Sequence, residues 1–268
     1  VVGYQSTQRK KPITPEMMFQ VGSITKTFTA ELLWQLQQAG KLNLNDRLGK
    51  YLPQYPKWKN ITLWQLVNQT SGIFDYIDTP GWFSMLARQP NKVWTMPALV
   101  RIAYHHKASF KPGKGWQYSN TNYVLAGMVA EKITGKSMTE LLQQTFFLPY
   151  HLKNTHYALT DFNSDVQARL VHGYFITKEG RAFDETYENT SWLASAGGIT
   201  STPAMINRWL THLFPRPKTQ MASPETGRSV TSTEHPAYAL GFFRMNTPVG
   251  LMWFTPGLTS GYRSMLSV

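Results

Sequence analysis

The sequence of 268 residues contains no cysteine and few acidic residues. Without cysteine the chain has no disulfide, no thiolate metal ligand and no thiol nucleophile. It also has no run of about twenty apolar residues, which a membrane-spanning helix requires. Only 15 Asp and Glu oppose 27 Lys and Arg, which leaves a net charge of +12.

The positive charge is spread along the sequence in single residues and short groups, such as Arg9-Lys10-Lys11 and Lys57 with Lys59. There is no run of five or six basic residues and no recognisable nucleic-acid-binding motif. We therefore expect no nucleic-acid partner. The charge is typical of a solvated basic surface, and association with an anionic cell wall is the alternative that it leaves open.

Hydrophobic periodicity predicts helices in the middle of the chain and strands at both ends. A helical period covers residues 23–38, and helical patterns with Pro and Gly interruptions continue from 42 to about 160. Residues 1–7 and the tail from 237 onward have strand-like patterns, with one more helix at 203–214. We predict an α/β (α+β) fold in which an antiparallel sheet, assembled from the two termini and flanked by helices, carries an inserted all-helical lobe.

The length fits a single catalytic domain over residues 1–268. We expect its α/β lobe to comprise about 1–40 and 190–268, and its helical lobe about 41–189. The sequence begins and ends inside strand-like segments, so we expect that both termini are trimmed. An export signal removed from such a chain would be invisible in its sequence.

The first candidate site is Ser23-Ile24-Thr25-Lys26, a Ser-x-x-Lys sequence at the start of the first predicted helix. Residues three apart share a helix face, so the hydroxyl and the amine can meet. A serine needs a base to remove its proton, and a lysine with a pKa lowered by burial can be that base. The helix N-terminus adds free N–H groups where an oxyanion would form. Chance supplies about one such pair in a chain of this kind, so the pair needs support from elsewhere.

That support comes from Tyr118-Ser119-Asn120, a loop triplet before a predicted helix. A phenol can relay a proton between nucleophile and leaving group, and an Asn amide can bind both a lysine and a substrate carbonyl. Tyr187-Glu188-Asn189 has the same Tyr-x-Asn pattern. We favour the first copy because Gly and Pro precede it and a helix follows it.

Together these motifs resemble the serine β-lactamase and penicillin-binding protein superfamily: the class C β-lactamases, the D-Ala-D-Ala carboxypeptidases and the family VIII carboxylesterases. Gln69 stands where the family usually has His. Further segments similar to the family are Phe19 to Lys26, Leu42 to Leu52, Ile61 to Ile73, Phe110 to Gly127 and Ala196 to Thr202. The resemblance implies an α/β sandwich with a helical lobe and an acyl-enzyme mechanism. It implies Ser23 as nucleophile, Lys26 as its proton partner, Tyr118 as base and acid, and Asn120 as the residue that orients lysine and substrate.

The third family motif, Lys-Thr-Gly or His-x-Gly, is altered here to Thr255-Pro256-Gly257. By resemblance, Gly257 permits close backbone approach and the N–H of Leu258 joins that of Ser23 in the oxyanion hole. Thr255 supplies a hydroxyl in place of the cation that helps to hold a substrate carboxylate. This change puts carboxypeptidase and β-lactamase activity in question. Arg263 could replace the missing cation, although a plain surface position is the simpler interpretation.

Other polar residues offer weaker candidates. His105-His106 has no third ligand at metal spacing, so we expect neither a metal nor a cofactor. His172 could face the site, but a structural role is the simpler interpretation. Asp75 and Tyr76 follow the Thr70-Ser71-Gly72 turn and could line the groove.

We therefore expect a periplasmic or secreted serine hydrolase that acts on a D-alanyl peptide, a β-lactam or an ester. The leading hypothesis is a D-alanyl-D-alanine carboxypeptidase of the penicillin-binding type or a β-lactamase-related enzyme. A family VIII-type carboxylesterase is the alternative that the weakened carboxylate site favours. A non-catalytic penicillin-binding homologue with a binding or regulatory role is the third.

Overall fold

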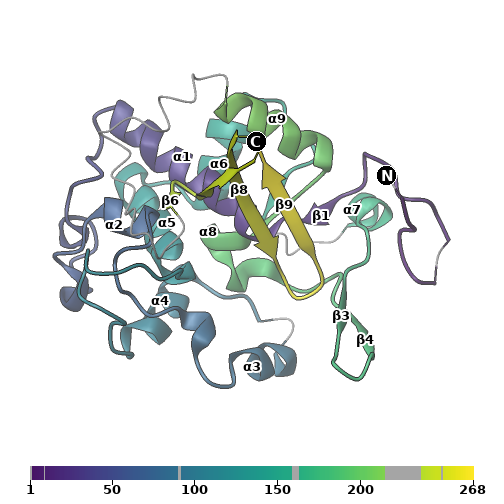
Figure 1. Ribbon diagram of the computed structural model, residues 1–268, viewed down its shortest axis with the longest axis horizontal. Coiled ribbons are helices and arrows are strands. Elements are labelled where there is room, and N and C mark those ends of the chain that lie inside the picture. Colours follow the sequence, from purple (N-terminus) through teal and green to yellow (C-terminus); the bar gives the residue numbers. More distant parts are fainter. Residues whose placement is uncertain (1, 9, 90–91, 159–162, 215–236, 249) are drawn as a thin grey trace.

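The structure is a computed structural model that describes all residues except 1, 9, 90–91, 159–162, 215–236 and 249 (Figure 1). The described chain folds into a helical body with antiparallel sheets packed on it, so the predicted α/β class is confirmed. The described α-helices are α1 Thr25–Gln38, α2 Leu63–Val67, α3 Trp82–Arg88, α4 Met96–Tyr104, α5 Asn120–Thr134, α6 Met138–Leu142, α7 Ser164–Arg169, α8 Ala194–Gly197 and α9 Pro203–Leu213. None of them is long and apolar enough to span a bilayer.

Short helical turns connect these helices. The 3₁₀ turns are η1 Gly22–Ile24, η2 Leu48–Lys50, η3 Pro56–Trp58, η4 Tyr76–Asp78 and η6 Thr190–Trp192, and η5 Gln143–Phe147 is a π-helical turn that continues α6. The predicted helix boundaries have local causes. Thr62 forms a capping box at the start of α2, and Ser137 forms one at the start of α6. Gly135, at φ 70°, ends α5 in the left-handed conformation that glycine adopts readily.

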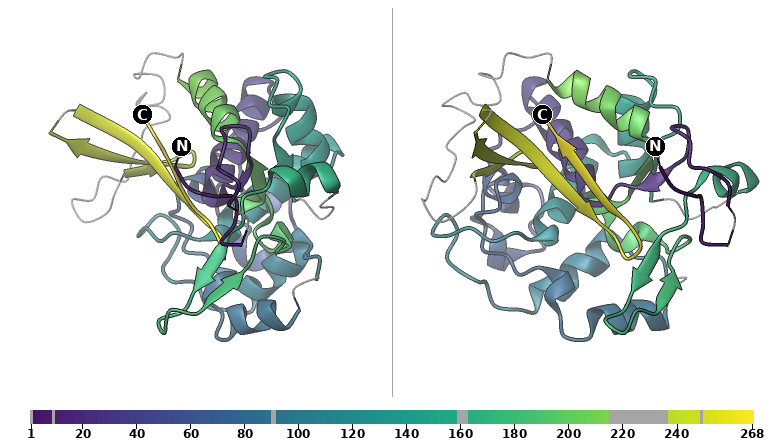
Figure 2. Two further views of the ribbon diagram at one scale, coloured as in Figure 1. Left: turned by 90° about the vertical axis from the view of Figure 1, so that its right-hand side faces the viewer. Right: turned by 45° about the vertical axis from the view of Figure 1, so that its right-hand side comes forward.

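The strands of the described residues form three antiparallel sheets. Their bounds are β1 Phe19–Gln20, β2 His156–Tyr157, β3 Tyr174–Ile176, β4 Ala182–Asp184, β5 Ile199–Ser201, β6 Ala237–Ala239, β7 Phe242–Thr247, β8 Gly250–Leu258 and β9 Arg263–Ser267. The orders are β1-β5-β2, β3-β4 and β6-β7-β8-β9. Figure 2 shows the four-stranded sheet as a separate layer on one face of the helices.

The prediction of one sheet built from both termini is wrong for the N-terminal segment. Of the described residues in 1–7, only Tyr4 forms a β-bridge, to Pro12, and no strand forms there. The four-stranded sheet comes from the last part of the chain alone, while β1 pairs with β5 in a different sheet. A strand-like pattern predicts extended backbone but does not identify the strand that it pairs with. Whether residues 1–7 form a strand therefore depends on a partner strand that their own sequence does not reveal.

Helix α1 is buried over most of its length. Phe28 stacks on Trp209 of α9 at 3.9 Å and packs edge-on against Phe146 at 6.0 Å. Threonines on α1 hold its neighbours through hydrogen bonds: Trp209 donates to Thr27, and Thr29 donates to the Ser195 carbonyl. A buried helix tolerates these polar groups because each has a partner. The start of α1 is thereby fixed against α8 and α9.

Candidate active site

Ser23 lies in η1, the tight turn that leads from β1 into α1. Gly22, which precedes it, has φ 52° and lies against strand β8: a Cβ on Gly22 would come within 2.5 Å of the Leu258 nitrogen. Only glycine satisfies both the positive φ and this close approach. The turn therefore presents the Ser23 hydroxyl beside the backbone of Leu258, the second predicted donor of the oxyanion hole.

Lys26 follows one turn later and its side chain is completely buried. Its Nζ lies 3.0 Å from Ser23 Oγ, 2.7 Å from Asn120 Oδ1 and 2.8 Å from the carbonyl oxygen of Ala196. A neutral amine can donate two hydrogen bonds and accept one. Donation to Asn120 and Ala196 therefore leaves the nitrogen lone pair for the Ser23 hydroxyl.

Burial lowers the pKa of Lys26, because the ammonium form loses its hydration inside the protein, and the nearby Asp75 carboxylate opposes this fall in part. The same burial raises the pKa of Asp75. The direction of the lysine shift is the one that a general base requires, since it increases the neutral fraction at physiological pH.

Tyr118 approaches the nucleophile from the other side, and its hydroxyl donates to Ser23 Oγ at 2.8 Å. Its ring packs edge-on against Tyr238 of β6 at 6.1 Å and parallel to Phe243 of β7 at 6.3 Å. These two strands therefore hold the ring in place. Burial raises the pKa of Tyr118 well above that of a free phenol. The side chain is therefore a phenol in the resting enzyme, which suits the donation of a proton, and its role as a base stays a prediction.

Asn120, at the start of α5, is oriented by Asp75. The carboxylate oxygen Oδ2 of Asp75 accepts from the Asn120 backbone N–H at 2.9 Å and from its Nδ2 at 2.8 Å. Because the amide nitrogen is engaged by an acceptor, the amide oxygen must face Lys26. Asp75 thus lies behind Asn120, whereas the sequence predicts only that it could line the groove.

Gln69, which replaces the family's usual His, fixes the loop that carries Tyr118. Its backbone carbonyl accepts from the Gln117 N–H at 3.1 Å, and its side-chain Oε1 accepts from the Ser119 N–H at 3.0 Å. The same Oε1 accepts from Asn122 Nδ2 at 2.6 Å. Gln69 therefore holds the residues on both sides of Tyr118. The sequence shows the substitution but does not predict this role, because the contacts join Gln69 to residues 117, 119 and 122.

The altered third motif lies on β8, beside η1. Gly257 packs so closely that a Cβ there would lie 2.0 Å from the Val21 carbonyl oxygen and 2.1 Å from Ser264 Oγ. Thr255 is buried on the same face of the strand, whereas Pro256 and Leu258 are exposed on the other. Thr255, Gly257 and Leu258 thus lie on the strand that flanks the nucleophile.

Arg263 is not brought toward this group of residues. It pairs with Leu258 across the β8–β9 ladder, and both side chains are exposed on the face opposite to Thr255 and Gly257. Residues that pair directly across an antiparallel ladder point to the same face. A role for Arg263 as the substituted anion partner remains a prediction, and its position is that of a surface arginine.

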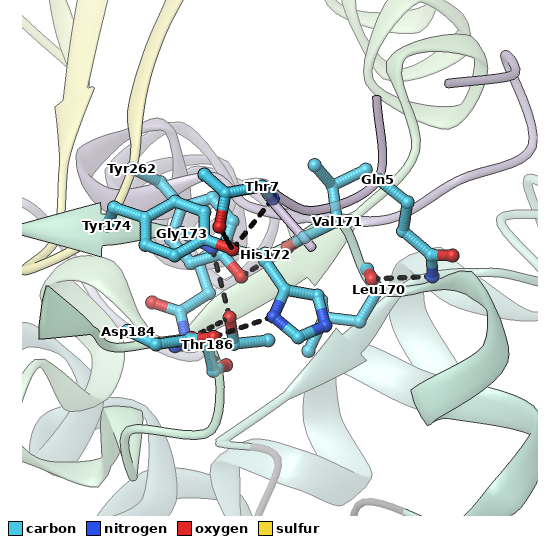
Figure 3. Close-up of polar contacts among 11 residues, drawn as sticks. Gln5, Thr7, Leu170, Val171, His172, Gly173, Tyr174, Asp184, Thr186 and Tyr262 are labelled. Carbon is cyan, nitrogen blue, oxygen red and sulfur yellow. Dashed lines mark hydrogen bonds and ion pairs between the residues drawn. The ribbon is translucent and has the colours of Figure 1, made fainter. Parts of the chain in front are cut away.

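His106 and His172 contact residues other than Ser23, Lys26, Tyr118 and Asn120. His106 stacks on Phe74 with ring centroids 4.0 Å apart. His172 pairs with Asp184 at 2.7 Å in a polar network at the β3–β4 hairpin (Figure 3). In that network Tyr262 donates to the Val171 carbonyl at 2.6 Å, which ties the hairpin to the β8–β9 turn. In the part of the chain that the structure describes, no cluster of three or more His, Asp or Glu could hold a metal.

Sequence comparison relates the whole chain to one family. Residues 1–268 match the family described as Beta-lactamase. The chain is 27% identical to "Penicillin-binding protein 4*" of Bacillus subtilis, covering 98% of this chain and 60% of that protein. It is 30% identical to "Protein flp" of Staphylococcus aureus, covering 91% of this chain and 49% of that protein. It therefore spans 49% to 60% of the length of these curated relatives.

Solved structures give the same result for the fold. A D-stereospecific amidohydrolase from Streptomyces sp. superimposes with a TM-score of 0.79 at 28% identity, covering 94% of this chain and 82% of that one. A penicillin-binding protein from Bacillus halodurans has a TM-score of 0.81 at 21% identity, covering 99% and 82%. The predicted resemblance is confirmed: the chain belongs to the β-lactamase family, whose penicillin-binding and amidohydrolase members share its fold.

Proposed function

We propose that this protein is a serine hydrolase that forms an acyl-enzyme on Ser23 and cleaves the amide bond that follows a D-amino acid residue, as in a D-alanyl peptide. One observation carries the proposal. The Ser23 hydroxyl oxygen lies within hydrogen-bonding distance of both the buried amine of Lys26, at 3.0 Å, and the phenol of Tyr118, at 2.8 Å. A nucleophile with a base on one side and a proton donor on the other is the arrangement that acyl transfer requires.

Acylation begins when neutral Lys26 takes the Ser23 proton and Oγ attacks the substrate carbonyl carbon. The new C–O bond forms as the carbonyl π electrons move onto oxygen. The N–H groups of Ser23 and Leu258 stabilise the resulting oxyanion. When the oxyanion collapses, the C–N bond breaks and its electron pair stays on the leaving nitrogen, which takes a proton from Tyr118. The lysine ammonium then restores the Tyr118 proton, directly or through the hydroxyl network.

Deacylation reverses these roles. A water molecule gives one proton to Lys26 or Tyr118, which acts as the base, and attacks the ester carbonyl. The oxyanion then forms again in the same oxyanion hole. Its collapse breaks the C–Oγ bond, and Ser23 recovers its proton from Lys26 or Tyr118. Asn120, fixed by Asp75, keeps the lysine directed at Oγ in both halves of the cycle.

The D-amino acid specificity is supported by the relatives. The Streptomyces neighbour is a D-stereospecific amidohydrolase, and penicillin-binding proteins appear among both curated relatives and neighbours. Such a substrate places the enzyme outside the cytoplasm, in the periplasm or secreted, where D-alanyl peptides of the cell wall occur. A β-lactam would acylate the same serine.

A carboxylesterase is the second candidate, favoured by Thr255-Pro256-Gly257. A substrate carboxylate needs a cation or several donors. Thr255 offers one hydroxyl, and Arg263 lies on the far face of the strand. Substrates without a carboxylate in the leaving group, such as amides and esters, do not need that cation. A non-catalytic homologue fits less well, because Ser23, Lys26, Tyr118 and Asn120 form one hydrogen-bonded group.

The test is acyl-enzyme formation and turnover by Ser23. Purified protein is incubated with a fluorescent penicillin, D-alanine p-nitroanilide, L-alanine p-nitroanilide and p-nitrophenyl butyrate. Ser23→Ala is the inactive variant, and Ser84→Ala, at an exposed serine, is its matched control. We expect Ser23-dependent labelling and turnover of the D-anilide over its L-enantiomer. Turnover of the butyrate ester alone supports the esterase, and no Ser23-dependent reaction supports the non-catalytic homologue.

A further inference from the structure

The helical part of the chain carries most of the unbalanced positive charge. Residues 47–130 contain ten Lys and Arg but only two acids, Asp75 and Asp78. Asp75 is buried behind Asn120, so its carboxylate does not reach the surface. From residue 79 to residue 130 the sequence has no Asp or Glu at all. A surface built from such a stretch has few acids to neutralise its basic side chains, and it therefore attracts anions.

A hollow of about 460 Å³ opens on this part of the surface, where residues 54–55 face helix α4. Tyr55, Pro97, Tyr104 and Met128 supply apolar or aromatic walls, and Arg101 and His105 supply basic groups. The described residues that line the hollow include no acid. A volume of several hundred Å³ with mostly apolar walls and a few polar groups is typical of a small-molecule site.

The aromatic wall of the hollow is held in place by contacts of its own. The ring centroids of Tyr55 and Tyr104 lie 5.5 Å apart, and Trp58 packs edge-on against Tyr104 at 4.9 Å. Lys57 donates through its ammonium group to the Tyr104 carbonyl at 3.0 Å, and its backbone N–H donates to the Tyr104 hydroxyl at 3.2 Å. The wall is therefore preformed, which lowers the entropic cost of binding a ligand.

The two basic groups of the hollow come from one side of α4. Arg101 and His105 lie four residues apart, so they are neighbours on the helix surface, and both side chains are exposed. Burial raises the pKa of Tyr55, and the positive charge of Arg101 opposes this rise, so the guanidinium is near enough to act on the Tyr55 hydroxyl. Within the described residues Arg101 forms no ion pair. Its guanidinium is therefore available to an anionic ligand.

We propose that this hollow binds a carboxylate or phosphate group carried on a ring-sized apolar body. The Arg101 guanidinium would hold the anion by two parallel hydrogen bonds, the usual geometry of arginine with either group. The His105 imidazole would donate a third hydrogen bond, and the apolar walls would cover the body of the ligand.

The hollow is a second site, apart from the hydrogen-bonded group around Ser23. Helix α5 connects the two: Asn120 at its start binds Lys26, and Met128 lines the hollow about 12 Å further along the helix axis. The ligand of the hollow is therefore not the bond that Ser23 attacks, and the inference goes beyond the proposed function.

The test measures the binding of phenyl phosphate and benzoate by isothermal titration calorimetry at low ionic strength. Benzyl alcohol is the reference ligand with a ring but no charge, and methyl phosphate and acetate are the references with an anion but no ring. Arg101→Gln removes the cation of the hollow. Arg88→Gln is the matched control, because Arg88 is an exposed arginine on α3 that does not line the hollow. Both variants lose one positive charge, so a general effect of net charge changes them equally.

We expect at least one aromatic anion to bind wild type with a Kd below about 1 mM. Arg101→Gln should raise this Kd about 10- to 100-fold, the usual effect of losing a charge-assisted hydrogen bond. Arg88→Gln should change it by less than about twofold. His105→Ala should raise it about 3- to 10-fold, and it decides the question if Arg101→Gln does not fold. Tighter binding of phenyl phosphate identifies a phosphate ligand, and tighter binding of benzoate identifies a carboxylate.

The inference is overturned if neither aromatic anion binds saturably, or if a reference ligand binds as tightly as its aromatic anion. A Kd that Arg101→Gln leaves unchanged, or that Arg88→Gln raises equally, also overturns it. The proposed function is tested separately, because Arg101→Gln should hydrolyse p-nitrophenyl butyrate at the wild-type rate. Anion binding by a protein that hydrolyses nothing refutes the proposed function alone, whereas hydrolysis without anion binding refutes the hollow alone.

Discussion

At the scale of single residues, the role of each polar group in the candidate site depends on how far burial removes it from water. Burial removes water from Lys26 and so disfavours its ammonium form, while the neutral amine can still donate to Asn120 and Ala196 and accept from Ser23. Burial also raises the pKa of Tyr118, which stays a phenol and therefore has the role of proton donor, whereas Lys26 has that of base. Burial thus separates the roles of base and acid for two groups that contact the same oxygen.

The lowered pKa of Lys26 predicts the pH dependence of acylation. The neutral amine is the active form, so kcat/KM should rise with pH through a limb well below the usual lysine pKa of about 10.4. The Asp75 carboxylate raises the pKa of Lys26, so Asp75→Asn should shift this limb to lower pH. It should also reduce the plateau about 10- to 100-fold, because Asn120 loses its orientation.

Hydrolysis of a neutral p-nitrophenyl ester between about pH 5 and about pH 9 measures both effects, since the substrate does not titrate. Asp78→Asn, at a neighbouring acid outside this hydrogen-bonded group, is the control and should leave the limb near its wild-type position. An unchanged limb in Asp75→Asn would show that the limb belongs to another group than Lys26.

The raised pKa of Glu188 predicts an effect on stability that is independent of any substrate. Burial raises the pKa of the Glu188 carboxyl to about 7 in the folded protein, from about 4.3 in the unfolded chain. The protonated carboxyl therefore contributes its full stabilisation below about pH 4, and this contribution is lost as the pH rises through about 7. Glu188→Gln should therefore raise the free energy of unfolding by about 1–2 kcal/mol at pH 8, and by almost nothing near pH 4. Urea denaturation at both pH values checks this, and a less stable variant at pH 8 would contradict it.

At the scale of elements, the site depends on the close contact between η1 and β8. Gly22 and Gly257 remove the two side chains that would separate them, and Ser264 on β9 donates to the Val21 carbonyl at 2.9 Å. Both predicted oxyanion donors, the N–H groups of Ser23 and Leu258, belong to this contact. A small separation of the two elements should therefore damage catalysis more than folding.

Gly257→Ala tests this contact, since its Cβ would lie 2.0 Å from the Val21 oxygen and must displace β8. We expect kcat/KM for p-nitrophenyl butyrate to fall about 100-fold or more, as for the loss of an oxyanion donor. The free energy of unfolding should fall by about 1–3 kcal/mol. Pro256→Ala, on the exposed face of the same strand, is the control and should change activity by less than about threefold. Nearly normal activity in Gly257→Ala would argue against an oxyanion donor on β8.

Local sequence signals predicted most of the helices and the two short motifs of the site because each signal lies within a few positions. Ser23 and Lys26 lie one helical turn apart, and Tyr118 lies two residues before Asn120 at the start of α5. The roles of Asp75, Gln69 and the Ala196 carbonyl were not predictable in this way. Their contacts join segments 45 to 170 positions apart. The missing N-terminal strand has the same cause, since its sequence pattern is suitable but no described strand pairs with it.

At the scale of the whole molecule, the net charge of +12 is the property that the site does not explain. A strongly basic surface attracts an anionic polymer, and the attraction weakens as salt shortens the screening length to about 8 Å at physiological ionic strength. If the substrate is a D-alanyl peptide of the cell wall, this attraction would concentrate the enzyme on the polymer without any contact at Ser23.

Co-sedimentation with purified insoluble cell-wall sacculi tests the charge separately from the site. We expect most of the protein to sediment at about 0.02 M salt and little of it at about 0.5 M, because screening at the higher concentration removes surface attraction. Ser23→Ala should sediment like wild type, since the binding depends on net charge. Salt-resistant binding that Ser23→Ala abolishes would instead assign the association to the active site, and no sedimentation at low salt would show that the basic surface is simply solvated.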